Sequence, residues 1–203
     1  MIIYCLISLN YFSELVVNSD DSEITFQSSD NILFKIHRKN LEASTGALSP
    51  DTFTTSDSMV VPLTEDAATL GLLFQYTYPG THPLLDDIQF SLLDSLAEAA
   101  EKYEVSAARS VCHIRMRCVD FYIGYEIATI LKATCSLALR EHPAEILRYA
   151  AKHDYPKLLS DVAVLTIGLP LVDVVSVLPP HLILTWVCMS CHLNSVESHI
   201  RRT

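Results

Sequence analysis

The sequence predicts an α+β fold, in which a small amino-terminal sheet is followed by a mostly helical region. The first observation is the segment FKIHRKNLEAST, residues 34–45, which reads as a short strand running into a short helix. The second is an extended Val60–Pro62 segment that precedes two long helical patterns, over 64–78 and 86–103. The third is a series of prolines after Glu141, each at a place where a helix can begin.

The composition predicts a folded protein with a sizeable core. Half of the 203 residues are apolar and 19% are charged, which is enough for one ordinary domain and part of a second. The net charge is −10, with only 14 Lys and Arg, so direct nucleic-acid binding is not expected. The one basic run, Lys35–Lys39, is too short for a nucleic-acid footprint and is interpreted as a solvated helix start.

The cysteines and the amino-terminal residues bear on location. Six scattered cysteines in a chain of this size favour reduced thiols and an intracellular protein, in cytoplasm or nucleus, over a disulfide framework. Residues 1–12 are apolar but lack the positive region and cleavage site of a signal peptide. They are also fewer than the roughly 20 residues that span a bilayer. We therefore expect no membrane partner.

A hairpin begins the predicted sheet. Glu23–Gln27 alternates at strand period, and Ile32–Ile36 is the returning strand. Ser28–Asn31 is a turn signal, because Asp and Asn tolerate the left-handed conformation. His37 closes the second strand, and Leu41 begins the apolar face of the helix that follows.

Three helices are predicted after the extended segment. In the first, Thr64 is the expected N-cap, with Glu65 and Asp66 in the first turn, and Pro79–Gly80 ends the helix. Its apolar residues recur at helical spacing: Leu70, Leu73, Phe74 and Thr77. The second helix places on one face Leu92, Leu93, Leu96, Ala99, Ala100 and Tyr103. The third begins at Ser106 and is expected to bury Ala107, Val111, Ile114 and Cys118.

The remaining segments predict a small stack of antiparallel helices packed as hairpins. Their apolar faces are Ile146, Leu147 and Ala150; then Leu158, Val162 and Leu165; then Leu171, Val174, Val175 and Leu178. The resulting domain organisation is an apolar segment at 1–17, a first domain at 18–117, an intervening segment at 118–136 and a helical extension at 137–203.

Several motifs together resemble the BTB/POZ fold, a protein–protein interaction module. The hairpin that leads through His37 and Arg38 to Leu41 resembles the start of that fold. VPLTEDAATLGLLFQYTYPG, from Val61, looks like its strand–helix unit, and AEAAEKYEV, from Ala97, is similar to its Ala-rich helix with a terminal Lys-Tyr. Two further motifs resemble the carboxyl-terminal extension of a large BTB group in mushroom-forming fungi. They are YAAKHDYP from Tyr149 and LTIGLPL from Leu165.

The resemblance implies a non-catalytic scaffold or adaptor whose partners are other proteins. The candidate interaction surface comprises Glu23, His37, Arg38 and Leu41, with Glu23 where many BTB proteins have Asp. An alternative is a substrate adaptor of a cullin ubiquitin ligase, but residues 44–58 lack the apolar-x-Glu motif of such adaptors. His37 has two interpretations, a group satisfied by backbone at the strand end or a pH switch.

Residues 118–136 lie between segments that BTB proteins join almost directly. The segment is interpreted either as an insert, such as a retained intron, or as an ordinary helix, because Ile127, Ile130, Leu131 and Thr134 recur at helical spacing. Residues 1–17 carry many Leu, Ile and Val side chains that would be costly to expose. We expect them to pair two copies of the chain as a homodimer, although a translation start further along the chain would also explain them.

An enzyme of another class, metal- or thiol-dependent, is the least favoured reading. Cys188, Cys191 and His192 carry soft metal ligands, but structural zinc needs four, so we expect no cofactor and no metal. The two cysteines are interpreted instead as small apolar residues of a core. No glycine-rich phosphate loop or nucleophile elbow is present, and no small-molecule substrate is expected.

Overall fold

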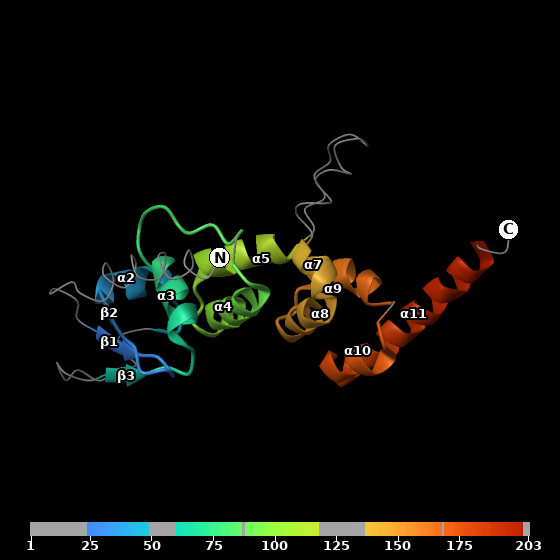
Figure 1. The fold of residues 1–203 in the computed structure, drawn as a ribbon, viewed down its shortest axis with the longest axis horizontal. Helices are drawn as coiled ribbons and strands as arrows, with labels where there is room; N and C mark the ends of the chain where they lie inside the picture. The colour runs from blue at the N-terminus through green and yellow to red at the C-terminus, as the bar shows by residue number, and fades with distance from the viewer. Residues whose placement is uncertain (1–23, 49–59, 87, 118–136, 168, 201–203) are drawn as a thin grey trace. The chain divides into compact units, whose positions relative to one another are not determined.

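The computed structural model describes residues 24–48, 60–86, 88–117, 137–167 and 169–200, with side chains up to His192 in the last segment. The chain divides into two compact units, one up to His113 and one from Ile114 onward. A small mixed sheet lies near the amino terminus and a mostly helical region follows it (Figure 1). The prediction of an α+β fold is therefore confirmed. Among the described helices, none has the length and apolar character needed to cross a bilayer.

The sheet has the strand order β2-β1-β3. β1 (Ile24–Gln27) pairs antiparallel with β2 (Leu33–Ile36) and parallel with β3 (Val60–Pro62). The hairpin turns through Asn31, whose φ of 66° is the left-handed conformation that Asn tolerates. Alternate residues of all three strands are buried, so one face of the sheet carries the core and the other is open.

Aromatic and aliphatic side chains join this sheet to the helices of the first unit. The ring of Phe74 lies 5.4 Å from that of Phe26 and 5.5 Å from that of Phe34. α2 (Arg38–Ser44) follows β2 directly and buries Leu41. α3 (Ala67–Gln75) buries the residues that the helical spacing singled out: Leu70, Leu73 and Phe74, with Thr77 just beyond its end.

The start of α3 differs from the prediction. Asp66, not Thr64, is the N-cap, and its carboxylate accepts a 2.8 Å hydrogen bond from the backbone N–H of Thr69. The chain before Asp66 is still bonded to the hairpin, because Ser29 N–H donates to the carbonyl of Glu65. Asp30, in the hairpin turn, accepts from the N–H of Ala67. These tertiary bonds keep Thr64 and Glu65 out of the helix.

α4 (Phe90–Lys102) buries the predicted face, with only Leu92 half-buried. α5 (Ser106–Met116) is rotated from its predicted orientation: it buries Ala108 and Cys112, whereas Ile114 is 64% exposed. The reason is the corner before it. Val105 is buried and fixes the phase of the helix, so the buried positions follow Val105 at helical spacing.

The described helices of the second unit follow one another along the chain, and all but the first begin at or just after a proline, as predicted. They are α7 (Leu137–Glu141), α8 (Pro143–Lys152), α9 (Pro156–Ala163) with the 3-10 turn η2 (Val164–Thr166), α10 (Leu171–Val177) and α11 (Pro180–Ile200). α8 packs closely on α9 and α10. Most predicted core positions are buried, but Leu165 and Leu171 are exposed.

The α4–α5 and α8–α9 corners share one backbone geometry. Glu104 and Asp154 have φ values of 55° and 56°, and each follows a helix end. The next residue in each corner, Val105 or Tyr155, donates its N–H over 2.9 Å to a carbonyl five residues back. This is a Schellman-type helix end, in which one left-handed residue satisfies the last carbonyls. Each position of the second corner lies 50 residues after its counterpart, a repeat that the sequence spacing alone did not reveal.

Candidate interaction surface

The four residues predicted to form an interaction surface have different positions. Glu23 lies outside the described residues, as do 1–17 and 118–136. His37 and Arg38 are half-buried at the start of α2. Leu41 has no exposed area and belongs to the core of the first unit. The described part of this surface is therefore His37 and Arg38.

His37 is held by Tyr78, which follows α3. The Tyr78 hydroxyl lies 2.9 Å from the His37 ring nitrogen Nδ1 and accepts a 3.3 Å hydrogen bond from the His37 backbone N–H. The two rings meet edge to face, with centroids 5.7 Å apart. The Tyr78 hydroxyl is thus a hydrogen-bond partner of the His37 ring, where the sequence interpretation expected a backbone group. Tyr78 joins the end of α3 to the junction between β2 and α2.

A groove of about 810 Å³ lies beside this junction, wholly within the first unit. Three segments line it: the carboxyl-terminal half of α2, the connection after α3, and the α4–α5 corner. The lining residues are Asn40, Ala43, Ser44, Thr45, Gly46, Tyr76, Thr77, Tyr78, Pro79, His82, Glu101, Glu104, Ser106, Ala107 and Arg109. The lining thus mixes short side chains, such as Ser44 and Thr45, with larger ones, such as Tyr76 and Arg109.

Polar groups of the groove bond to one another. Ser44 donates its hydroxyl to the carbonyl of Thr77 over 3.0 Å, and Tyr76 donates to the carbonyl of Pro83 over 2.8 Å. The His82 ring nitrogen Nε2 lies 3.3 Å from the carbonyl of Tyr78. Burial raises the pKa of Tyr76, with the nearby Cys112 thiol adding to the effect. These bonds fix the walls of the groove.

Acidic side chains gather at the α4–α5 end of the groove. The Glu101 carboxylate forms an ion pair with the Arg109 guanidinium, 3.4 Å away. Glu104 is exposed and projects from its left-handed position toward Gly46, where a Cβ atom would collide with the Glu104 side chain. Because Gly46 has no side chain, the Glu104 side chain can lie against it at the rim of the groove.

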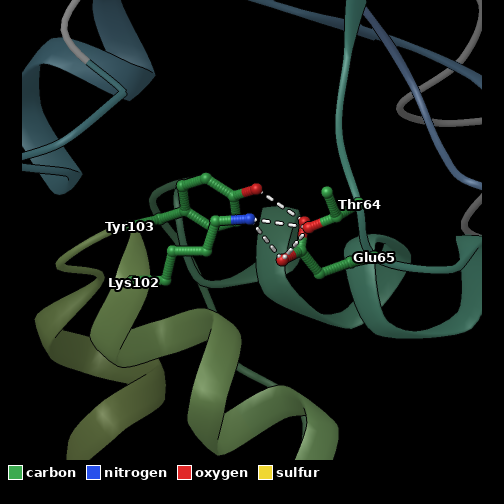
Figure 2. A network of polar contacts seen from close by, with 4 residues as sticks. All are labelled: Thr64, Glu65, Lys102 and Tyr103. Carbon is green, nitrogen blue, oxygen red and sulfur yellow. Dashed lines mark hydrogen bonds and ion pairs between the residues drawn. The ribbon is translucent and has the colours of Figure 1, made fainter.

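A second polar cluster lies elsewhere in the first unit, between the β3–α3 connection and the end of α4 (Figure 2). Lys102 contacts Glu65 through its ammonium over 2.8 Å and donates to Thr64 over 2.7 Å. Tyr103 donates its hydroxyl to the other oxygen of Glu65 over 2.5 Å. The Lys-Tyr pair that the sequence analysis singled out thus holds the carboxylate that was expected in the first turn of α3.

The pKa values in this cluster follow from the contacts. Burial acts to raise the pKa of Glu65, but hydrogen bonds from Lys102 and Tyr103 outweigh it and the pKa lies below its usual value. Burial and the bond to Glu65 together raise the pKa of Tyr103 to about 12. The carboxylate is charged and fully engaged, so the cluster has a structural role in tying α4 to the sheet.

The cysteines differ in environment. Burial raises the pKa of Cys112 to about 12, which leaves a protonated, unreactive thiol near neutral pH. Cys188 and Cys191 are free and exposed on α11, so the interpretation of both as core residues is wrong. Across the described residues, no three His, Cys, Asp or Glu side chains are grouped closely enough to hold a metal ion.

Sequence reasoning missed Tyr78 and Glu104, which the fold brings to the groove from segments distant in sequence. A signal for Tyr78 is its place just before Pro79–Gly80, where the chain must turn; no local signal marks Glu104. No protein-family model matches the chain, and no curated protein matches it.

Proposed function

We propose that this chain is a non-catalytic protein–protein interaction module of BTB/POZ type, a scaffold or adaptor that binds itself or other proteins. The observation that carries the proposal is the groove of the first unit. Its walls are fixed by internal hydrogen bonds, and its rim presents Glu104 and the backbone around Gly46. The order of the sheet, followed by α3, α4 and α5, supports the same family.

The chemistry of the groove favours a polypeptide over a small substrate. Small-molecule sites are enclosed, largely apolar pockets with a few convergent polar groups. This groove is wide and open, and its lining mixes backbone and short side chains with larger ones such as Tyr76, His82 and Arg109. A polypeptide segment can lie along such walls, and a basic side chain can meet Glu104 at the rim, where charge complementarity favours the correct partner.

The test is comparative affinity capture from the native cell, read by mass spectrometry. Glu104→Lys reverses the charge at the rim and should lower the recovery of groove-dependent partners at least severalfold. Asp154→Lys is the matched control. Asp154 is also an exposed acid in the left-handed position of a helix corner, so its replacement costs the same backbone strain, but it belongs to the other unit and does not line the groove.

Equal recovery of every captured protein by the wild type, Glu104→Lys and Asp154→Lys would contradict the groove as the binding surface. Circular dichroism of each variant confirms that it is folded before capture. A purified preparation that turns over a substrate would instead favour the enzyme alternative.

Self-association is part of the proposal and rests on residues 1–17. Burial of their apolar side chains against a second copy would contribute several kcal/mol at about 25 cal/mol per Å². Light scattering in the presence of a metal chelator compares the full chain with a form that begins at Asn18. A dimer that becomes a monomer on removal of the segment is the expected result, whereas two monomers at tens of micromolar contradict the homodimer.

A further inference from the structure

Trp186 fixes the rotation of α11 within the second unit. Its side chain is buried, and the indole N–H donates a 2.9 Å hydrogen bond to the Thr166 hydroxyl, itself buried in η2. At 3.6 residues per turn, Cys188 lies about 160° around the helix axis from Trp186 in one direction, and Cys191 lies about 140° from it in the other. Both thiols therefore point away from the core that holds the tryptophan.

The outward side of α11 is a continuous stripe, which we call the outer stripe. It consists of the exposed residues His181, Leu184, Thr185, Cys188, Cys191 and His192. Leu184 is 76% exposed. No Asp, Glu, Lys or Arg occurs between Pro180 and Val196, although the chain as a whole has a net charge of −10. A surface helix normally covers its outer side with charge, so this stripe lacks the usual solvent-facing chemistry.

The absence of charge on the outer stripe suits a second copy of the same chain as its occupant. Two copies that each carry a net charge of −10 repel each other, and like charges brought together oppose association. Along the outer stripe that repulsion is absent, and Leu184 gains burial. A two-fold axis pairs the same patch on both copies, so two antiparallel α11 helices can cover each other.

Two cysteines separated by three residues supply half of a tetrahedral metal site. Side chains at i and i+3 on a helix are neighbours, with Cβ atoms about 5–6 Å apart. Zinc–thiolate bonds of about 2.3 Å place two bound sulfurs about 3.8 Å apart, which such a pair can reach. One chain falls short of four ligands, but the symmetry-related chain contributes the same two.

We propose that two copies of this chain share one structural zinc ion, bound by Cys188 and Cys191 of each copy across a two-fold axis between their α11 helices. Each thiol loses its proton on binding. The site does not exist in a single chain, and it uses neither the groove nor residues 1–17. Its presence or absence is therefore independent of the proposed function.

The experiment uses the full chain, purified with reductant and micromolar zinc, and gel-filtered before elemental analysis. The expected content is one zinc for every two chains, and removal of the metal with a chelator should halve the mass in light scattering. Cobalt substituted for zinc should give the intense thiolate-to-metal absorption of sulfur ligation. Cys188→Ser and Cys191→Ser should each abolish zinc retention and the cobalt band.

Thr185→Ala is the matched control, because it alters the same outer stripe one turn before Cys188 without removing a ligand. Cys5→Ser removes a thiol elsewhere, and both controls should keep zinc and dimer. Circular dichroism verifies that every variant is folded. If a serine variant does not fold, the cobalt spectrum of the wild type still tests whether sulfur atoms bind the metal.

Any of the following outcomes overturns the proposal: no retained metal, one zinc per monomeric chain, or zinc that survives both serine substitutions. A dimer that forms only as a disulfide, broken by reductant in the presence of zinc, also overturns it.

Discussion

Glu65 shows how one side chain connects distant parts of the first unit. Its carboxylate accepts from Tyr103 and contacts Lys102, and its backbone carbonyl accepts from Ser29 of the hairpin. The side chain is only 14% exposed, whereas that of Lys102 is 47% exposed. The Tyr103 bond is therefore the less screened of the two and the larger contributor.

Glu65→Gln is expected to lower the free energy of unfolding by about 1–2 kcal/mol near neutral pH, less than a fully buried charged hydrogen bond would contribute. Because the folded-state pKa is below the ordinary value of 4.5, this stabilisation is complete above 4.5 and is lost as the pH falls through the folded-state pKa. Urea melts at about pH 7 and about pH 3.5 measure the difference. The exposed Glu42→Gln is the control, and an equal loss in both variants would exclude this role.

Replacement of Leu96 tests the core of the first unit, again at the scale of one residue. The residue has no exposed area, and it belongs to the helix that packs on α3, which carries the equally buried Phe74. Leu96→Ala should cost on the order of 2–5 kcal/mol, as buried leucine truncations do. Leu84→Ala is the control, since Leu84 is 82% exposed. A change below about 0.5 kcal/mol for Leu96→Ala in denaturant melting would remove Leu96 from the core.

At the scale of elements, the repeated corner is the main finding. Both corners use an acidic residue where glycine is the usual choice. A left-handed conformation costs a residue with a Cβ about 1–2 kcal/mol, and glycine avoids that cost but adds about 0.5–1 kcal/mol of chain entropy to the unfolded state. The difference between these two terms gives glycine a small net advantage in the free energy of unfolding.

Glu104→Gly and Asp154→Gly should therefore each raise the free energy of unfolding by about 0.5 kcal/mol. Ser110→Gly, inside α5, is the control and should lower it by about 0.5 kcal/mol, because glycine is a poor helix former. Thermal and urea melts of the three variants distinguish the cases. Destabilisation of either corner variant by as much as Ser110→Gly would mean that the acidic side chain itself stabilises the corner.

At the scale of the whole molecule, residues 118–136 separate α5 from α7. Deletion of 119–136 should leave the fold intact, because the motifs that resemble those of BTB proteins lie before and after this segment and not within it. Deletion of α8, Pro143–Lys152, is the control and should abolish the cooperative melt of the second unit, since α8 packs on α7, α9 and α10. Far-UV circular dichroism and urea melting measure both. Loss of soluble expression on deletion of 119–136 would show that the segment belongs to a core.

Sequence reasoning predicted the elements whose signals are local. The hairpin follows from strand alternation and Asn31, and the later helices follow from prolines that fit a helix start. It misplaced the cap of α3, because hydrogen bonds from the hairpin decide where that helix begins. It also misjudged the rotation of α5, because the preceding corner sets the phase. The first determinant is distant in sequence, whereas the second is a left-handed corner at Glu104 that no glycine marks.

The groove could not be predicted from the sequence for the same physical reason. Its walls come from α2, the connection after α3 and the α4–α5 corner, and only the folded core brings them together. His37 and Arg38 were singled out through the resemblance to BTB proteins, but Tyr78, the partner of His37, lies 41 residues away along the chain. The exposure of Cys188 and Cys191 depends on the rotation that Trp186 imposes on α11.

Trp186 also gives the molecule a built-in optical probe. It is the only tryptophan of the chain, and it is buried in the second unit with its indole bonded to Thr166. Its emission therefore follows the second unit alone during denaturation, while far-UV ellipticity follows the helices of both units. If the two signals change together, the units unfold as one cooperative body; if they separate, each unit has its own transition.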